Sequence, residues 1–73
     1  MRAYSWYMHD HSRGDCVIWV QDVVETDIGY SVTCIWHILD ASGQPYVAPG
    51  VTQYKHEITF QEASLWNFYE IPV

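Results

Sequence analysis

The clearest pattern in the chain is an alternation of apolar and polar residues over positions 30–38. Successive side chains on a β-strand point to opposite faces, so a period of two predicts a strand with one buried face. The residues expected on the buried face are apolar or aromatic: Tyr30, Val32, Cys34, Trp36 and Ile38.

Other segments also have strand character. Arg2–His9 and Thr52–Thr59 alternate in the same way, and a brief strand is expected at Tyr46 and Val47. Cys16–Glu25 begins with apolar residues on both faces, which is typical of a central strand. The short connection before position 30 ends in Gly29, which we expect to adopt a positive φ in a hairpin turn.

The period changes after Ile58. Thr59 and Glu62 have the spacing of a capping box, in which each side chain bonds the other residue's backbone N–H. Ile58 and Ala63 are placed to form the accompanying hydrophobic staple. This pattern predicts a helix that begins after Thr59, runs to about Glu70 and is stopped by Pro72.

These elements predict an α+β fold. The chain has 73 residues, which is enough for one small domain over residues 1–73. We expect an antiparallel three- to five-stranded sheet, arranged as a meander, with one C-terminal helix packed on one face.

The aromatic content exceeds what such a small core needs. Four Trp, six Tyr and two Phe side chains are present, and each can bury about 150–250 Å². Some should therefore stay exposed, where aromatic residues often dominate binding interfaces. The candidates for partner binding are Trp19, Tyr30 and Trp66.

The charge is strongly negative. Three Lys and Arg residues stand against nine Asp and Glu, for a formal net charge of −6, and no Lys or Arg occurs from Gly14 to Tyr54. Nucleic acids and anionic membranes both attract basic surfaces, so direct binding to either is disfavoured. The expected partner is a basic protein surface.

Three carboxylates, Asp22, Glu25 and Asp27, fall at the end of the second predicted strand and in the following turn. Spaced in this way, they resemble a row of phosphates that a nucleic-acid-binding protein would recognise. The alternative interpretation is a solvated hairpin tip whose charges keep the domain soluble and prevent edge pairing.

Evidence for an enzyme is thin. The side chains of His9 and His11 would share one face of a strand and offer two zinc ligands, but a zinc site needs three or four. Cys34 and His37 should lie on opposite faces, and Cys16 has acidic neighbours that favour its thiol form. Cys16 and Cys34 are expected to be buried thiols, although a disulfide stays open. We predict no catalytic residues, no metal and no cofactor.

Nothing resembles a targeting or membrane-spanning segment, because the longest apolar run, Cys16–Val20, is far shorter than the ~20 residues a spanning helix needs. A cytoplasmic protein is therefore expected. In size, acidity and aromatic content the chain is similar in style to phage-encoded inhibitors of bacterial defence, such as anti-CRISPR proteins. That likeness is compositional and implies a viral, stoichiometric inhibitor of a nucleic-acid-handling complex in the host cytoplasm.

The leading hypothesis is thus a non-enzymatic protein-binding module. Two alternatives remain open. One is a small structural homo-oligomer, for instance a homodimer formed by sheet pairing. The other is a small zinc-binding protein that uses His9 and His11.

Overall fold

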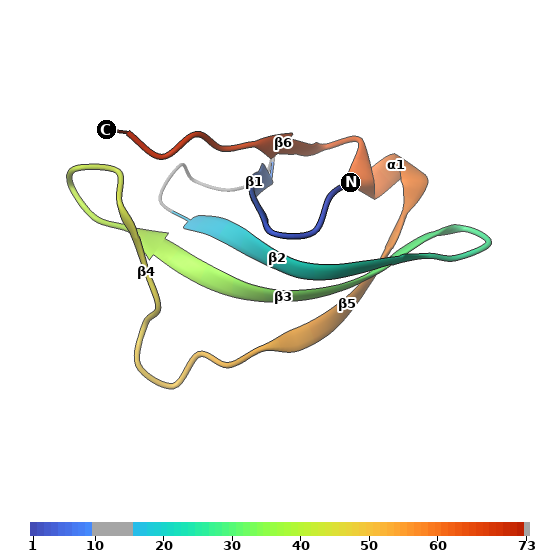
Figure 1. Ribbon diagram of the computed structural model, residues 1–73, viewed down its shortest axis with the longest axis horizontal. Helices are drawn as coiled ribbons and strands as arrows, with labels where there is room; N and C mark the ends of the chain where they lie inside the picture. Colours follow the sequence, from blue (N-terminus) through green and yellow to red (C-terminus); the bar gives the residue numbers. More distant parts are fainter. Residues whose placement is uncertain (10–15, 73) are drawn as a thin grey trace.

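A computed structural model describes residues 1–9 and 16–72, with only the backbone given for His9. Within these residues the chain forms an antiparallel sheet and a single helical turn (Figure 1). The elements, in chain order, are β1 (Ser5–His9), β2 (Cys16–Glu25), β3 (Gly29–Leu39), β4 (Pro45–Tyr46), β5 (Tyr54–Thr59), α1 (Phe60–Ala63) and β6 (Trp66–Phe68).

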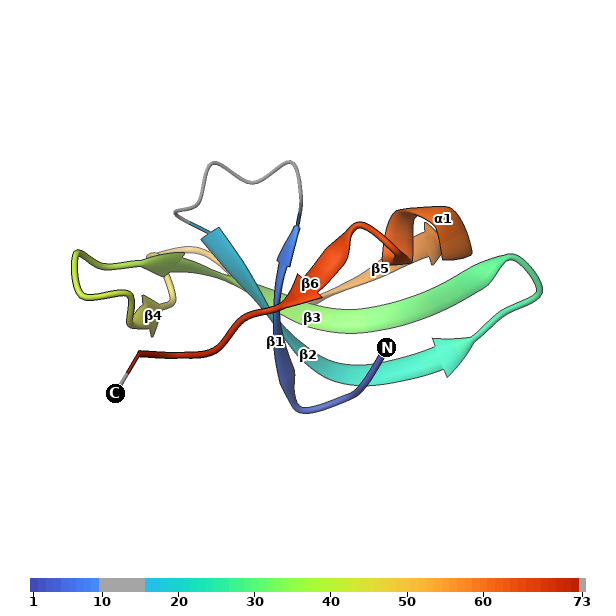
Figure 2. The same cartoon turned by 90° about the horizontal axis from the view of Figure 1, so that it is seen from above.

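The sheet is a meander whose last strand returns to its first. The strand order is β4-β3-β2-β1-β6, and β5 also pairs with β3. β4 and β5 share one edge of β3: β5 runs along Gly29 to Cys34, and β4 pairs with Ile38 and Leu39. Seen from above, β1 and β6 cross β2 and β3 steeply, so the sheet bends over its own core (Figure 2).

The predicted alternation on the third strand is confirmed. Val32 and Cys34 are fully buried, and Tyr30 and Trp36 pack against the same core. The register brings their partners to the same face, because Val20 lies opposite Cys34 and Ile18 opposite Trp36. The buried cluster consists of Tyr7, Ile18, Val20, Val32, Cys34, Ile58 and Trp66.

β2 is a central strand, as its apolar start predicted. It pairs with β1 on one side and with β3 on the other. Val17 is also fully buried, although it does not belong to the main cluster. Its neighbour Ile18 belongs to that cluster, and adjacent strand residues face opposite ways. The start of β2 is therefore buried on both faces.

A β-bulge interrupts β2. Val20 lies opposite Cys34, but Asp22 lies opposite Thr33, so β2 uses one residue more than β3 at this point. The extra residue, Gln21, reverses the phase of the alternation. Val23 therefore faces the core opposite Val32, and Asp22 is exposed to solvent.

The predicted capping box is confirmed, but the predicted helix to Glu70 is wrong. Thr59 Oγ1 accepts a hydrogen bond from the Glu62 N–H at 3.1 Å, and the Thr59 N–H donates to Glu62 Oε1 at 3.4 Å. The helix is nevertheless only four residues long, and the chain then forms β6. The fold is accordingly a small antiparallel sheet with one short helix.

The free edge of β1 explains why the helix stops. Phe68 pairs with Tyr7, and Trp66 pairs with His9, so β6 finds backbone partners that a longer helix would not use. Strand pairing also buries Trp66, which is 7% exposed. Aromatic residues fit a half-buried pleated surface well. Tertiary contacts thus override the helical pattern.

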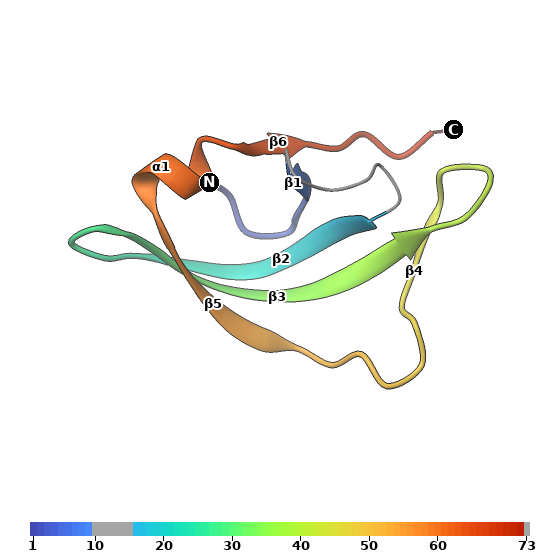
Figure 3. The same ribbon diagram turned by 180° about the vertical axis from the view of Figure 1, so that it is seen from behind.

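The expectation of a positive φ at Gly29 is wrong. Gly29 is a buried residue of β3, and the described glycines with positive φ are Gly43 and Gly50. A Cβ atom at Gly29 would overlap the carbonyl oxygen of Ile58, so the position needs glycine for the close approach of β5. Figure 3, the view from behind, shows β5 passing in front of β3 on its way to α1.

We predict that Gly29→Ala lowers the free energy of unfolding by about 3 kcal/mol, because backbone atoms of β3 or β5 must move. Gly50→Ala is the matched control. Its φ of 84° strains alanine, but no atom lies within 4 Å of the added Cβ, so about 1 kcal/mol is expected. Urea denaturation measures both values. Equal losses in the two variants would contradict the role of Gly29 in packing.

Candidate protein-binding surface

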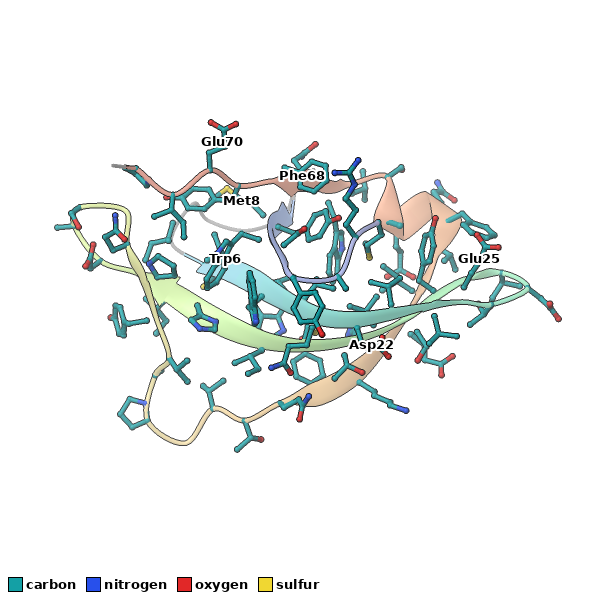
Figure 4. All side chains as sticks on the ribbon, viewed as in Figure 1. Trp6, Met8, Asp22, Glu25, Phe68 and Glu70 are labelled. Carbon is teal, nitrogen blue, oxygen red and sulfur yellow. The ribbon has the colours of Figure 1, made fainter. Side chains whose placement is uncertain are left out.

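The hairpin between β2 and β3 projects beyond α1 at one end of the molecule (Figure 1). Its turn is closed by two hydrogen bonds between Thr26 and Gly29: Thr26 N–H donates to Gly29 O at 2.8 Å, and Gly29 N–H donates to Thr26 Oγ1 at 3.0 Å. The predicted acidic residues, Asp22, Glu25 and Asp27, are all exposed, but the structure does not gather them on one surface. Asp22 lies nearer the middle of the molecule and faces the opposite side of the sheet from Glu25 (Figure 4).

Two aliphatic side chains stand among these carboxylates. Val24 is 55% exposed and Ile28 is 69% exposed. Val24 owes its exposure to the bulge, which turns it to the same side as Asp22. The hairpin thus exposes apolar area beside its carboxylates.

The three carboxylates have no compensating partner in the described part of the chain. No hydrogen bond or ion pair involves the side chains of Asp22, Glu25 or Asp27. The described strands carry one Lys or Arg residue, Lys55 on β5. Lys55 and Asp22 lie on either side of Thr33, so they are two strands apart. The hairpin thus carries negative charge on both of its faces and at its turn.

A cleft of about 300 Å³ opens beside the hairpin. One wall combines Tyr7 and Phe68, whose rings stack at 4.9 Å, with Trp66 at 6.2 Å from Tyr7. The other combines Tyr30 and Phe60, which meet edge to face at 5.3 Å. The full lining is Met1, Tyr7, Tyr30, Phe60, Ala63, Ser64, Trp66 and Phe68.

The cleft and the hairpin are joined at two points. Glu25 belongs to the hairpin and is the cross-strand partner of Tyr30. Tyr30 in turn lines the cleft. The Phe60 N–H donates to Ile28 O at 3.0 Å, which ties the start of α1 to the hairpin. Figure 4 shows Glu25 at the α1 end of β2, and Phe68 on β6.

The structure separates the three aromatic residues predicted to bind a partner. Tyr30 is half-buried and lines the cleft. Trp19 lies on the opposite face of the sheet, 4.8 Å from Trp6 between ring centres. Trp66 was expected to be exposed, and that expectation is wrong, because β6 buries it beneath the cleft.

Sequence reasoning missed Phe60 and Phe68, which are 46% and 63% exposed. The signal for Phe68 was present, since Trp66 and Phe68 are two apart and share a face on a strand. The helical interpretation of this segment concealed it. Phe60 follows the helix cap directly, and no local pattern indicates that it lines a cleft.

The thiols do not pair with one another. Cys16 lies opposite Ile38 and Cys34 opposite Val20, so they are separated by four positions along β2. That separation exceeds the reach of a disulfide. Burial raises the pKa of the Cys34 thiol, against the opposing effect of a hydrogen bond with Tyr54. His37 contacts Trp6 on the other face, as predicted for a residue three positions from Cys34.

The zinc alternative stays a prediction. His11 lies outside the described residues, as does the side chain of His9. Among the side chains that are described, no three of His, Cys, Asp or Glu converge as a metal site requires.

The chain matches no known protein family, and no curated protein or solved structure shows significant similarity to it. A membrane-spanning helix is absent from residues 1–9 and 16–72, where α1 has four residues.

We predict an alkaline loss of stability that depends on Cys34. A thiol with a raised folded pKa stabilises the fold below its unfolded pKa of about 8.5, and this contribution disappears as the pH rises through the folded pKa. Above pH ~8.5 the free energy of unfolding should fall by at most about 1.4 kcal/mol per pH unit for this group, until the pH passes the folded pKa. Denaturation at several pH values, with reductant, measures the slope.

Cys34→Val provides the comparison, because valine fills the buried site without an ionisable group. The slope between about pH 8.5 and 10 should be shallower in this variant, because valine does not ionise. Burial and then Cys34 itself raise the pKa of Tyr54 above this range, so Tyr54 contributes little to the slope there. Identical slopes would show that Cys34 ionises equally easily in the folded and unfolded states.

Proposed function

We propose that this protein is a non-enzymatic binding module that docks on a basic surface of another protein. The observation that carries the proposal is the β2–β3 hairpin, where exposed aliphatic side chains stand among uncompensated carboxylates. The partner that suits it best is a nucleic-acid-handling effector. Occupation of its basic groove by this domain would make the chain a stoichiometric, anti-CRISPR-like inhibitor in the host cytoplasm.

The two kinds of side chain have separate roles in this proposal. Asp22 and Asp27 steer the domain toward a basic surface and oppose acidic partners. Val24 and Ile28 supply apolar area that loses its water on contact, which charged groups alone do not provide. Together they favour a specific interface over a diffuse electrostatic encounter.

The placement of the reactive side chains supports a non-enzymatic role. The Cys34 thiol is buried in the core, while His37 packs against Trp6 on the opposite face. Neither points toward the cleft or the hairpin. The surfaces that are exposed carry recognition chemistry: rings, aliphatic groups and carboxylates.

A homodimer is the second candidate, and the sequence of β5 favours it. β5 pairs only with β3 among the described strands, so its other edge has no strand partner. Lys55 and Glu57 flank His56 symmetrically. Two copies of β5 paired antiparallel around His56 would place each Lys55 opposite a Glu57 of the other copy.

We predict that Asp22→Lys/Asp27→Lys weakens partner binding by at least about tenfold, mainly through slower association at low salt. The partner is first captured on tagged protein from bacterial lysates, including strains with active CRISPR systems, and is released in salt steps. The single changes Asp27→Lys and Glu70→Lys form the matched pair, because each changes the net charge equally. Glu70 lies on the C-terminal segment, away from the hairpin (Figure 4). An equal loss of affinity in both variants would show that net charge alone explains the effect.

The dimer candidate predicts a different pattern. Light scattering at micromolar concentration should give twice the monomer mass for the native protein. Glu57→Lys should yield monomers, because it sets Lys opposite Lys, and the swap Lys55→Glu/Glu57→Lys should restore the dimer. A monomeric native protein would eliminate this candidate.

A further inference from the structure

The cleft beside the hairpin has the composition of a site for a cation. Five of its eight lining residues are aromatic, and they form two groups of contacting rings. Aromatic faces carry partial negative charge, so they attract an ammonium or guanidinium group within about 6 Å of the ring centre. Phe60 and Phe68 are both exposed, so the rings are accessible from solvent.

One neighbouring charge has the complementary sign. Glu25 lies opposite Tyr30 and shares the face of that ring, whereas the Glu62 carboxylate is bonded to the Thr59 N–H in the capping box. Arg2 follows Met1 at the cleft, where its N–H donates to Tyr7 Oη at 2.7 Å. The Arg2 side chain is exposed and is not among the residues that line the cleft.

The size of the cleft limits its occupant. A volume of about 300 Å³ is at the lower end for small-ligand pockets, and it suits one long side chain better than a folded segment. Guanidinium groups are planar, stack on aromatic faces and are less strongly hydrated than ammonium groups. Arginine is therefore the side chain that best matches a cleft lined by aromatic rings with the Glu25 carboxylate nearby.

We infer that this cleft receives an arginine side chain of the partner protein while the hairpin docks on the basic surface around it. The inference rests on the proposed function, and it adds the identity of the group that is recognised. Glu25 shares the face of Tyr30, and Ile28 is bonded through its backbone to Phe60, so the turn end of the hairpin adjoins the cleft. Asp22 and Val24 point to the opposite face of the sheet, so the partner surface that fills the cleft meets the turn end of the hairpin.

The test uses the full chain and two short peptides, so it needs no identified partner. One is an acetylated, amidated tripeptide with a central arginine, and the other has citrulline in its place, which is nearly isosteric but uncharged. Each is titrated while the amide and indole signals are followed by NMR. The arginine peptide should shift the Trp66 indole and Phe68 signals and bind about five- to thirty-fold more tightly than the citrulline peptide.

Matched variants locate the site. Phe68→Leu keeps an apolar side chain but removes an exposed ring, so arginine binding should fall by about five-fold or more. Tyr46→Leu removes a ring of similar exposure, 48%, outside the cleft, and should leave binding unchanged. Glu25→Gln should weaken binding by about two- to five-fold, and Glu57→Gln should have no effect.

Equal affinity for arginine and citrulline would overturn the inference, and so would shifts confined to Trp6 and Trp19. Loss of binding in Tyr46→Leu as large as in Phe68→Leu would also overturn it. These outcomes are distinct from failure of the proposed function, which would appear as unchanged partner affinity in Asp22→Lys/Asp27→Lys. Peptide binding can therefore be present when the hairpin proposal fails, and absent when it succeeds.

Discussion

The bulge in β2 fixes where each side chain of the hairpin points. With a regular period of two after Val20, Asp22 and Val24 would face the core, and Val23 and Glu25 would face away from it. The extra residue at Gln21 reverses this, so that Val23 packs in the core and Asp22 reaches solvent. It also brings Glu25 to the face of Tyr30. Both the acidic tip and the carboxylate beside the cleft therefore depend on one irregularity in the pairing of β2 with β3.

The return of the chain to β1 is the second constraint, and it links stability to the cleft. β6 buries Trp66 against Tyr7 and at the same time places Phe68 over the Tyr7 ring. Two of the cleft residues, Tyr7 and Trp66, thus belong to the core, and two others, Phe60 and Phe68, remain largely exposed. A domain of this size has a small core, so apolar side chains that stay exposed to water do not add to its stability. The proposed binding role would give these exposed rings a use.

What the sequence predicts well here is local. The strand over Cys16–Glu25 and the capping box at Thr59 follow from period and spacing, and the structure confirms both. The failures have non-local causes. Whether Trp66–Phe68 forms a helix or a strand depends on the free edge of β1, and Gly29 is glycine because β5 passes close to it. The bulge leaves no clear signal at Gln21. Since the cleft needs both β6 and the bulged hairpin, it could not be anticipated, even though Tyr30 was among the residues singled out.

Coupling between hairpin and cleft matters for how firmly a partner would be held. The hydrogen bond from the Phe60 N–H to Ile28 O and the pairing of Gly29 with Thr59 hold the start of α1 against the base of the hairpin. The wall formed by Tyr30 and Phe60 therefore keeps a fixed position relative to Asp27 and Ile28. A preformed arrangement avoids part of the entropy that flexible loops lose on binding. The capping box at Thr59 thereby acquires a role beyond its single helical turn, because it orders the junction where the acidic tip meets the aromatic wall.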